Sequence, residues 1–258
     1  MSQNKDYKVS RSDAPLGQTP SGKQKAQGPS RQSVWKMFDR IAHRYDLLNH
    51  LLSLNRDKFW RKKVASYLPN GDKLAILDLA TGTGDQLIAL ADSGRVERGL
   101  GLDLSEKMLD FGRTKIDRLK LGDRLTLNIG DAESIPCKDE SFDAVTISFG
   151  IRNVNDVLNA LSEMRRVLKP GGRALILEFS LPSSRVMRSL HLFYLRHLLP
   201  HLGRMISGDD QAYRYLNQTI ETFPYGVSFC SLMTQVGFVE ASFIPLTFGV
   251  VSIYIGEA

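Results

Sequence analysis

Apolar positions along this chain recur with two different spacings. From Val34 to Leu52, and again within residues 57–67, they repeat every three or four residues, as on one face of a helix. Further along, short apolar runs are separated by amphipathic stretches. The runs predict strands at 74–79, 98–103, 125–129, 142–148 and 173–179. The stretches between them predict helices at 85–93, 105–121 and 155–168.

Regular alternation of strands and helices predicts an α/β fold with a mostly parallel sheet and right-handed crossovers. After the fifth strand we expect a helical insertion at about 183–222 and a last helix at 226–236. Two apolar runs, 238–245 and 249–255, then close the chain, and only a few residues separate them. They should pair as an antiparallel hairpin, which makes a seven-stranded sheet.

The first 30 residues differ from the rest in composition. They are rich in Ser, Gly, Gln, Pro and Lys and hold almost no large apolar side chain, so we expect a disordered tail. Residues 1–36 contain seven basic and two acidic side chains, which account for most of the net charge of +6. The remainder is nearly neutral, so nucleic acid is not an expected partner. We expect a helical cap at 31–70 and one domain at 71–258.

Other features narrow the class of protein. No run of about 18 apolar residues occurs, so no membrane-spanning helix is expected. The N-terminus has no apolar signal segment, and the two cysteines, Cys137 and Cys230, lie far apart. These features fit two free thiols in a reducing cytoplasm. The five histidines show no metal-ligand spacing, so no metal site is predicted.

The segment Ile76–Asp85 carries the strongest chemical signal. A short apolar run leads into a Gly-Thr-Gly turn, and a helical pattern follows at once. Gly82 and Gly84 have no Cβ, so the backbone can turn tightly and approach a ligand closely. A strand, a glycine turn and a helix in this order are typical of nucleotide-cofactor sites in doubly wound α/β folds.

The downstream residues indicate which cofactor is bound. A dinucleotide fingerprint needs a third glycine, and Leu87 stands in its place. Asp103 ends the second strand about 20 residues beyond the turn, where a carboxylate can hold ribose hydroxyls. Asp131 follows the third strand and precedes Ala132, and an acid there can accept a hydrogen bond from an adenine amino group. The alternative is that both acids merely cap the next helices.

Several longer segments resemble a known family. The chain is similar to class I S-adenosylmethionine-dependent methyltransferases, which are Rossmann-like, and more narrowly to the ubiquinone/menaquinone biosynthesis C-methyltransferases. The similar segments are Tyr45–Asn49, Leu77–Asp85, Ile147–Asn153, Arg166–Gly172, Leu177–Ser180 and Tyr213–Leu216. Thr81 departs from the family, which usually has glycine there, and His50 stands where an acid is frequent.

The resemblance implies S-adenosylmethionine as the cofactor. It places Thr83, between Gly82 and Gly84, against the methionine end, and Asp103 on the ribose. It implies further contacts with the adenine and the pocket wall, from Asp131, Ala132 and Ser148. Asp78 has two interpretations, a water-mediated contact with the cofactor's amino group or a structural role.

The resemblance also implies C-methylation of a prenylated quinol, namely demethylmenaquinol, a ubiquinol precursor or both. Loss of a phenolic proton makes the ring carbon nucleophilic, so a base or a positive charge near the oxygen would help. Arg152 would stabilise the phenolate or orient a water that acts as base, and Asn153 would orient the acceptor. Tyr45 and Asp46 would close over the acceptor, with Asp46 as a candidate base.

Simpler interpretations stay open beside these. Arg152 would instead pair with a nearby acid, and Tyr45 would be part of the packing of the cap. The alternative functions are methylation of another small lipophilic acceptor, and cofactor binding without turnover in a quinone-synthesis assembly.

Residues 185–206 combine many apolar side chains with flanking arginines. One interpretation is a lid or a homodimer surface packed onto the domain. The other is a tunnel for an isoprenoid tail or a peripheral contact with the inner face of the membrane.

Overall fold

One mixed sheet organises the part of the chain that the structure describes. The structure is a computed structural model, and it describes residues 7–10, 50, 53–199 and 210–258. Its eight strands lie in the order β1-β7-β8-β6-β5-β2-β3-β4. They span β1 Tyr7–Ser10, β2 Leu74–Leu79, β3 Val96–Asp103, β4 Leu125–Ile129, β5 Phe142–Ser148, β6 Leu168–Phe179, β7 Glu240–Leu246 and β8 Val251–Glu257.

Helices follow most of the strands, as the alternating pattern predicts. The α-helices span α2 Arg56–Ala65, α3 Asp85–Ala91, α4 Glu106–Arg118, α5 Val157–Val167, α6 Arg185–Phe193, α8 Asp210–Thr222 and α9 Val227–Gln235. Short helical turns span η2 Ile151–Asn153, η3 Tyr194–Leu198 and η4 Thr247–Gly249. The described part of the predicted cap contains α2, whereas Tyr45 and Asp46 lie outside the described residues.

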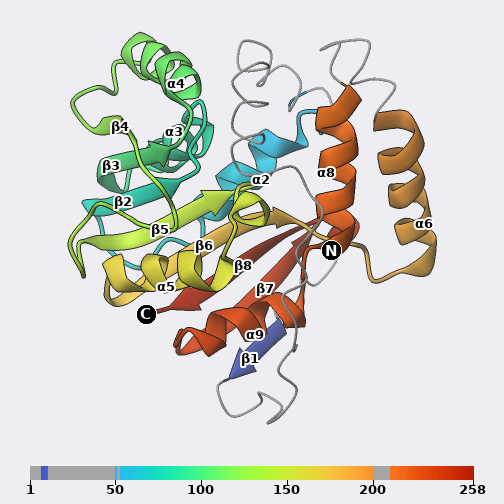
Figure 1. Cartoon of the computed structure of the whole chain (residues 1–258). Helices are drawn as coiled ribbons and strands as arrows, with labels where there is room; N and C mark the ends of the chain where they lie inside the picture. The colour runs from blue at the N-terminus through green and yellow to red at the C-terminus, as the bar shows by residue number, and fades with distance from the viewer. Residues whose placement is uncertain (1–6, 11–49, 51–52, 200–209) are drawn as a thin grey trace.

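The predicted fold class is confirmed. Strands β2 to β6 pair in parallel, and β7 and β8 form the terminal antiparallel hairpin against β6. The structure differs from the expected disordered tail at Tyr7–Ser10, because these four residues form β1 at the edge of the sheet beside β7 (Figure 1). Pairing with β7 satisfies backbone groups that an edge strand would leave open.

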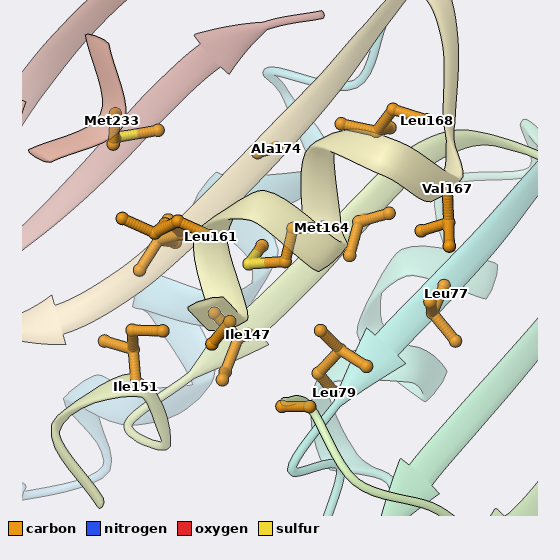
Figure 2. Close-up of a cluster of buried hydrophobic side chains, with 14 of the residues drawn as sticks. Leu77, Leu79, Ile147, Ile151, Leu161, Met164, Val167, Leu168, Ala174 and Met233 are labelled. Carbon is orange, nitrogen blue, oxygen red and sulfur yellow. The ribbon is translucent and has the colours of Figure 1, made fainter. Parts of the chain in front are cut away.

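Alternate residues of β2 are buried on opposite faces of the sheet. Leu77 and Leu79 belong to a cluster with side chains of α5 and α9, whereas Leu74 and Ile76 pack with α2, α3 and α4. Figure 2 shows the first cluster, in which Leu161 of α5 lies over the sheet. Burial on both faces explains why β2 is an unbroken apolar run apart from Asp78.

The strand order places the candidate site. Strands β3 and β4 follow β2 toward one edge of the sheet. Strands β5 and β6 come next in the chain and lie on the opposite flank of β2 in the strand order. The order therefore reverses between β2 and β5. In open α/β sheets, ligands bind in the crevice at the carboxyl ends of the strands where this reversal occurs.

The described part of the insertion after β6 consists of α6, η3 and α8. Helices α6 and α8 lie beside each other at one end of the sheet (Figure 1). Leu195, Leu199 and Ile220 form a small apolar core between its parts, and Phe179 at the end of β6 packs against it. This contact places the insertion next to the carboxyl edge of the sheet.

Leu161 tests the packing of α5 on the sheet. It is fully buried, so Leu161→Ala should lower the free energy of unfolding by about 2–5 kcal/mol through lost burial and the cavity left behind. Urea denaturation measures this loss. The neighbouring Ser162 is exposed, and Ser162→Ala is the matched control with little expected effect. Equal stability of the two variants would contradict the packing.

Candidate active site

The glycine turn after β2 contains two residues with left-handed backbone conformation. Gly82 and Gly84 have φ of 56° and 79°, a region that glycine adopts without a steric penalty. The Thr81 amide donates to the Leu102 carbonyl at 3.0 Å, which fastens the turn to β3. The helix α3 begins directly after Gly84. The turn therefore presents backbone at the carboxyl edge of the sheet, as predicted.

Asp103 connects this turn to the end of β3. One carboxylate oxygen accepts from the Gly82 amide at 2.8 Å, and the other accepts from the Ser105 amide at 2.9 Å. These two hydrogen bonds fix the orientation of the carboxylate at the end of β3. The side chain is half-buried, so it is both positioned and accessible.

Asp131 and Ala132 lie beyond the end of the next strand. Ile129, the last residue of β4, pairs with Asp103 across the sheet, so both acids lie at the same edge. The Asp131 carboxylate accepts from the Glu133 amide at 2.9 Å, and Ala132 is buried beside it. The structure thus brings the two predicted acids to neighbouring strand ends.

Thr83 and Ser148 are held by residues that the sequence analysis did not single out. The Thr83 hydroxyl accepts from the Lys115 ammonium on α4 at 2.9 Å. Ser148, the last residue of β5, donates to the Gln86 side-chain carbonyl at 2.9 Å. Gln86 is buried, and its amide nitrogen donates to the Arg61 carbonyl at 3.3 Å. Gln86 therefore links α2, α3 and β5 around the turn.

Asp78 is a structural residue in this geometry. Its two oxygens accept from the Thr81 and Thr146 hydroxyls at 2.6 and 2.5 Å, so the carboxylate joins β2, the turn and β5. Burial raises the pKa of Asp78 to about 6, although the two hydroxyl hydrogen bonds and the charge of Arg61 oppose the rise. Of its two predicted roles, the contacts favour the structural one.

Arg152 lies in η2, immediately after β5, and forms a buried ion pair with Glu178 near the end of β6. The distance is 2.8 Å, and the two side chains are only 6% and 1% exposed. The same guanidinium nitrogen donates to the Phe149 carbonyl at 2.6 Å. Burial raises the pKa of Glu178, and the charge of Arg152 opposes that rise. Arg152 therefore pairs with an acid, as the simpler interpretation expects, and this contact by itself does not test a role in catalysis.

Each member of the Arg152–Glu178 pair has one buried polar atom that forms no hydrogen bond. The Arg152 Nε and the second Glu178 oxygen, Oε2, are buried without a hydrogen-bond partner. The guanidinium lies 5.4 Å from the centre of the Phe179 ring, and the Phe149 and Phe179 rings are 4.7 Å apart. A charged group thus lies beside an aromatic wall at the carboxyl ends of β5 and β6.

Asn153 is contacted from the insertion. The Tyr215 hydroxyl on α8 donates to the Asn153 side-chain oxygen at 3.1 Å. Burial raises the pKa of Tyr215. Sequence reasoning assigned no role to Tyr215 or to Glu178, although both lie in segments that carried the family resemblance. Among the described residues, no group of side chains could hold a metal ion.

The fold of the described residues is Rossmann-like, and solved methyltransferases share it. A methyltransferase from Thermotoga maritima, described as S-adenosylmethionine-dependent, superposes with a TM-score of 0.59 at 20% identity, over 86% of this chain and 99% of that one. A methyltransferase from Aquifex aeolicus superposes with a TM-score of 0.58 at 15% identity, over 82% and 96%. At these identities the likeness concerns the fold.

The sequence comparisons narrow this class to a family. The model of the ubiE/COQ5 methyltransferase family matches residues 25–258, so the chain belongs to that family. A Bacteroides fragilis protein named demethylmenaquinone methyltransferase is 40% identical, over 88% of this chain and 93% of its own. A Geobacter sulfurreducens protein named ubiquinone/menaquinone biosynthesis C-methyltransferase UbiE is 44% identical, over 88% of each. The predicted family, enzyme class and cofactor, S-adenosylmethionine, are confirmed.

The raised pKa of Asp78 predicts a pH dependence of stability. An acid whose pKa is higher in the folded than in the unfolded state stabilises the fold below about pH 3.8, and this contribution is lost as the pH rises through about 6. Relative to Asp78→Asn, the wild-type protein should lose about 2 kcal/mol of unfolding free energy between pH 4 and 7. Urea denaturation across this range measures the difference.

Asp72→Asn, at an exposed position, is the control for removal of one charge. The assignment fails if Asp78→Asn and wild type keep a constant difference in stability over the whole range.

Proposed function

We propose that this enzyme transfers a methyl group from S-adenosylmethionine to a ring carbon of a prenylated, demethylated quinol, either demethylmenaquinol or a ubiquinol precursor. The observation that carries this proposal is the Arg152 guanidinium held against aromatic rings at the carboxyl edge. An aromatic wall suits an apolar ring, and a guanidinium suits a developing phenolate. The names of the two relatives, which refer to menaquinone and ubiquinone, support the same acceptor class.

The described residues fit the cofactor. We assign the ribose hydroxyls to the Asp103 carboxylate and the adenine to Asp131 and Ala132 at the neighbouring strand end. The turn at Gly82 and Gly84 admits close approach of the amino-acid end. Because the Thr83 hydroxyl faces Lys115, we expect residue 83 to contribute mainly through its backbone. Ser148, fixed by Gln86, would line the pocket.

The proposed mechanism depends on alignment. When bound, S-adenosylmethionine supplies a methyl group on a sulfonium, ready for in-line displacement. Arg152 would stabilise negative charge on the quinol oxygen, because a guanidinium stays protonated throughout. Glu178 would hold Arg152 in place, and Tyr215 would hold Asn153. The role of Tyr45 and Asp46, as a closing pair with Asp46 as base, stays a prediction.

A methyl-transfer assay with a panel of acceptors tests this function. Labelled methyl should appear on carbon when demethylmenaquinol or a ubiquinol precursor is offered, and not on a simple catechol or on phosphatidylethanolamine. Mass spectrometry of the products locates the new bond. Transfer only to the other acceptors would replace the substrate assignment. Cofactor binding without transfer to any quinol would instead indicate a non-catalytic partner protein.

In the same assay, Arg152→Lys should lower kcat by roughly 10- to 100-fold. Lysine lacks the planar guanidinium, whose several N–H donors could contact Glu178 and the acceptor at the same time. Lysine keeps a charge opposite Glu178, which avoids an unpaired buried carboxylate. The dissociation constant of S-adenosylmethionine should not change. Arg173, in the middle of β6, pairs with Glu257 at 2.7 Å, so Arg173→Lys is the matched control. Unchanged kcat in Arg152→Lys would contradict the assignment.

We also propose that α6 contacts a lipid surface. Val186, Leu190 and Phe193 lie four and three residues apart on this helix, and each is more than half exposed. An exposed apolar face of this kind, next to the exposed Arg185, suits the interface of an anionic bilayer. Of the helices that the structure describes, none is long and apolar enough to cross a membrane, so the proposed contact is peripheral.

Co-sedimentation with anionic vesicles tests the lipid contact. Leu190→Glu combined with Phe193→Glu should remove most of the vesicle binding, because charges would replace the inserted side chains. Leu119 is an equally exposed apolar residue after α4, and Leu119→Glu is the control that should still bind. If the intact protein does not bind vesicles, the proposal is wrong. A dimer that dissociates in the α6 variant would instead indicate a homodimer surface.

A further inference from the structure

Arg61 on α2 is a buried cation that forms no direct ion pair with the described residues. The residue is only 8% exposed, and no described carboxylate lies within ion-pair distance. Its Nε is buried without a hydrogen-bond partner, and its guanidinium carbon lies 5.5 Å from the centre of the Phe149 ring. Burying a charge without a direct ion-pair partner is costly, so an anionic ligand group beside Arg61 would be favoured.

The surroundings of Arg61 place it at the cofactor crevice. Its carbonyl accepts from Gln86 in the first turn of α3, and Gln86 in turn binds Ser148 at the end of β5. Its positive charge also lowers the pKa of Asp78, so the guanidinium lies near the end of β2. The two oxygens of Asp78 are already engaged by the Thr81 and Thr146 hydroxyls. The Arg61 guanidinium therefore lies near the carboxyl ends of β2 and β5.

The strand order then fixes which part of the cofactor lies near Arg61. Asp103 and Asp131 mark the ends of β3 and β4, on the other side of β2 from β5. A cofactor with its ribose at β3 and its adenine at β4 extends its amino-acid end toward β2 and β5. That end carries the only carboxylate of S-adenosylmethionine, and a guanidinium matches a carboxylate in both charge and geometry.

We propose that Arg61 binds the methionine carboxylate of S-adenosylmethionine. The inference rests on the cofactor assignment and adds a specific role for a residue of the cap helix. Gln86 holds the backbone of Arg61 at this place, because it links the Arg61 carbonyl to Ser148 of β5.

Calorimetry with two ligands that differ in one group tests the proposal. S-adenosylmethionine and its decarboxylated form are identical except for the carboxylate. Arg61→Met should weaken binding of S-adenosylmethionine by roughly 10- to 100-fold and leave the decarboxylated ligand almost unaffected. Arg61→Lys, which keeps the charge, should recover part of the loss. Lys62 is the exposed neighbour on the same helix, and Lys62→Met should bind both ligands as wild type does.

The melting temperature of the ligand-free protein separates this role from a structural one. Arg61→Met removes a buried charge without an ion-pair partner but also a charge that favours the Asp78 carboxylate, so the ligand-free variant should melt close to the wild-type temperature. An equal loss of affinity for both ligands, or no loss for either, would overturn the proposal. If the wild-type protein binds neither ligand, the cofactor assignment fails as well. If only the KM for the quinol rises, Arg61 faces the acceptor and not the cofactor.

Discussion

The geometry at the carboxyl edge of the sheet depends on the two hydrogen bonds that the Asp78 carboxylate accepts. This carboxylate is the one charged group of a fully buried strand, and it joins Thr81 in the glycine turn to Thr146 in β5. Those hydroxyls determine how β2 and β5 lie relative to the turn, at the place where the strand order reverses. Ionising a buried acid costs free energy, even when it is hydrogen-bonded. Its hydrogen bonds, however, specify one arrangement of the turn and the two strands, which an apolar residue at this position would not do.

Local pattern was enough to predict the sheet domain. The strands at 74–79, 125–129 and 142–148 have the predicted bounds, because apolar runs between turn residues determine them without long-range information. The acids at Asp103 and Asp131 were predicted for a similar reason. Carboxyl ends of neighbouring parallel strands lie at one edge, so a residue that follows a strand can be placed from its position alone. Strand β1 could not be predicted in this way, because its pairing with β7 joins residues at opposite ends of the chain.

The unpredicted parts of the site depend on pairings that spacing does not encode. Glu178 lies within a strand and reads as an interruption of an apolar run, and only the adjacency of β5 and β6 shows that it meets Arg152. Gln86 looks like an ordinary first-turn residue until α2 and β5 are both placed around it. Tyr215 reaches Asn153 from an insertion whose path no periodic pattern determines. Each case is a tertiary contact between segments far apart in sequence.

The two arginines at this edge differ in a way that suits a cationic cofactor. A sulfonium would be repelled by a bare guanidinium nearby, and repulsion is strong where burial lowers the effective dielectric constant. Arg152 has its charge balanced by Glu178, so it can lie near the reacting centre and still donate hydrogen bonds. Arg61 has no such partner among the described residues, and on our proposal the methionine carboxylate balances its charge. The two charges would then offset each other at the methionine end, which reduces the repulsion between Arg61 and the sulfonium.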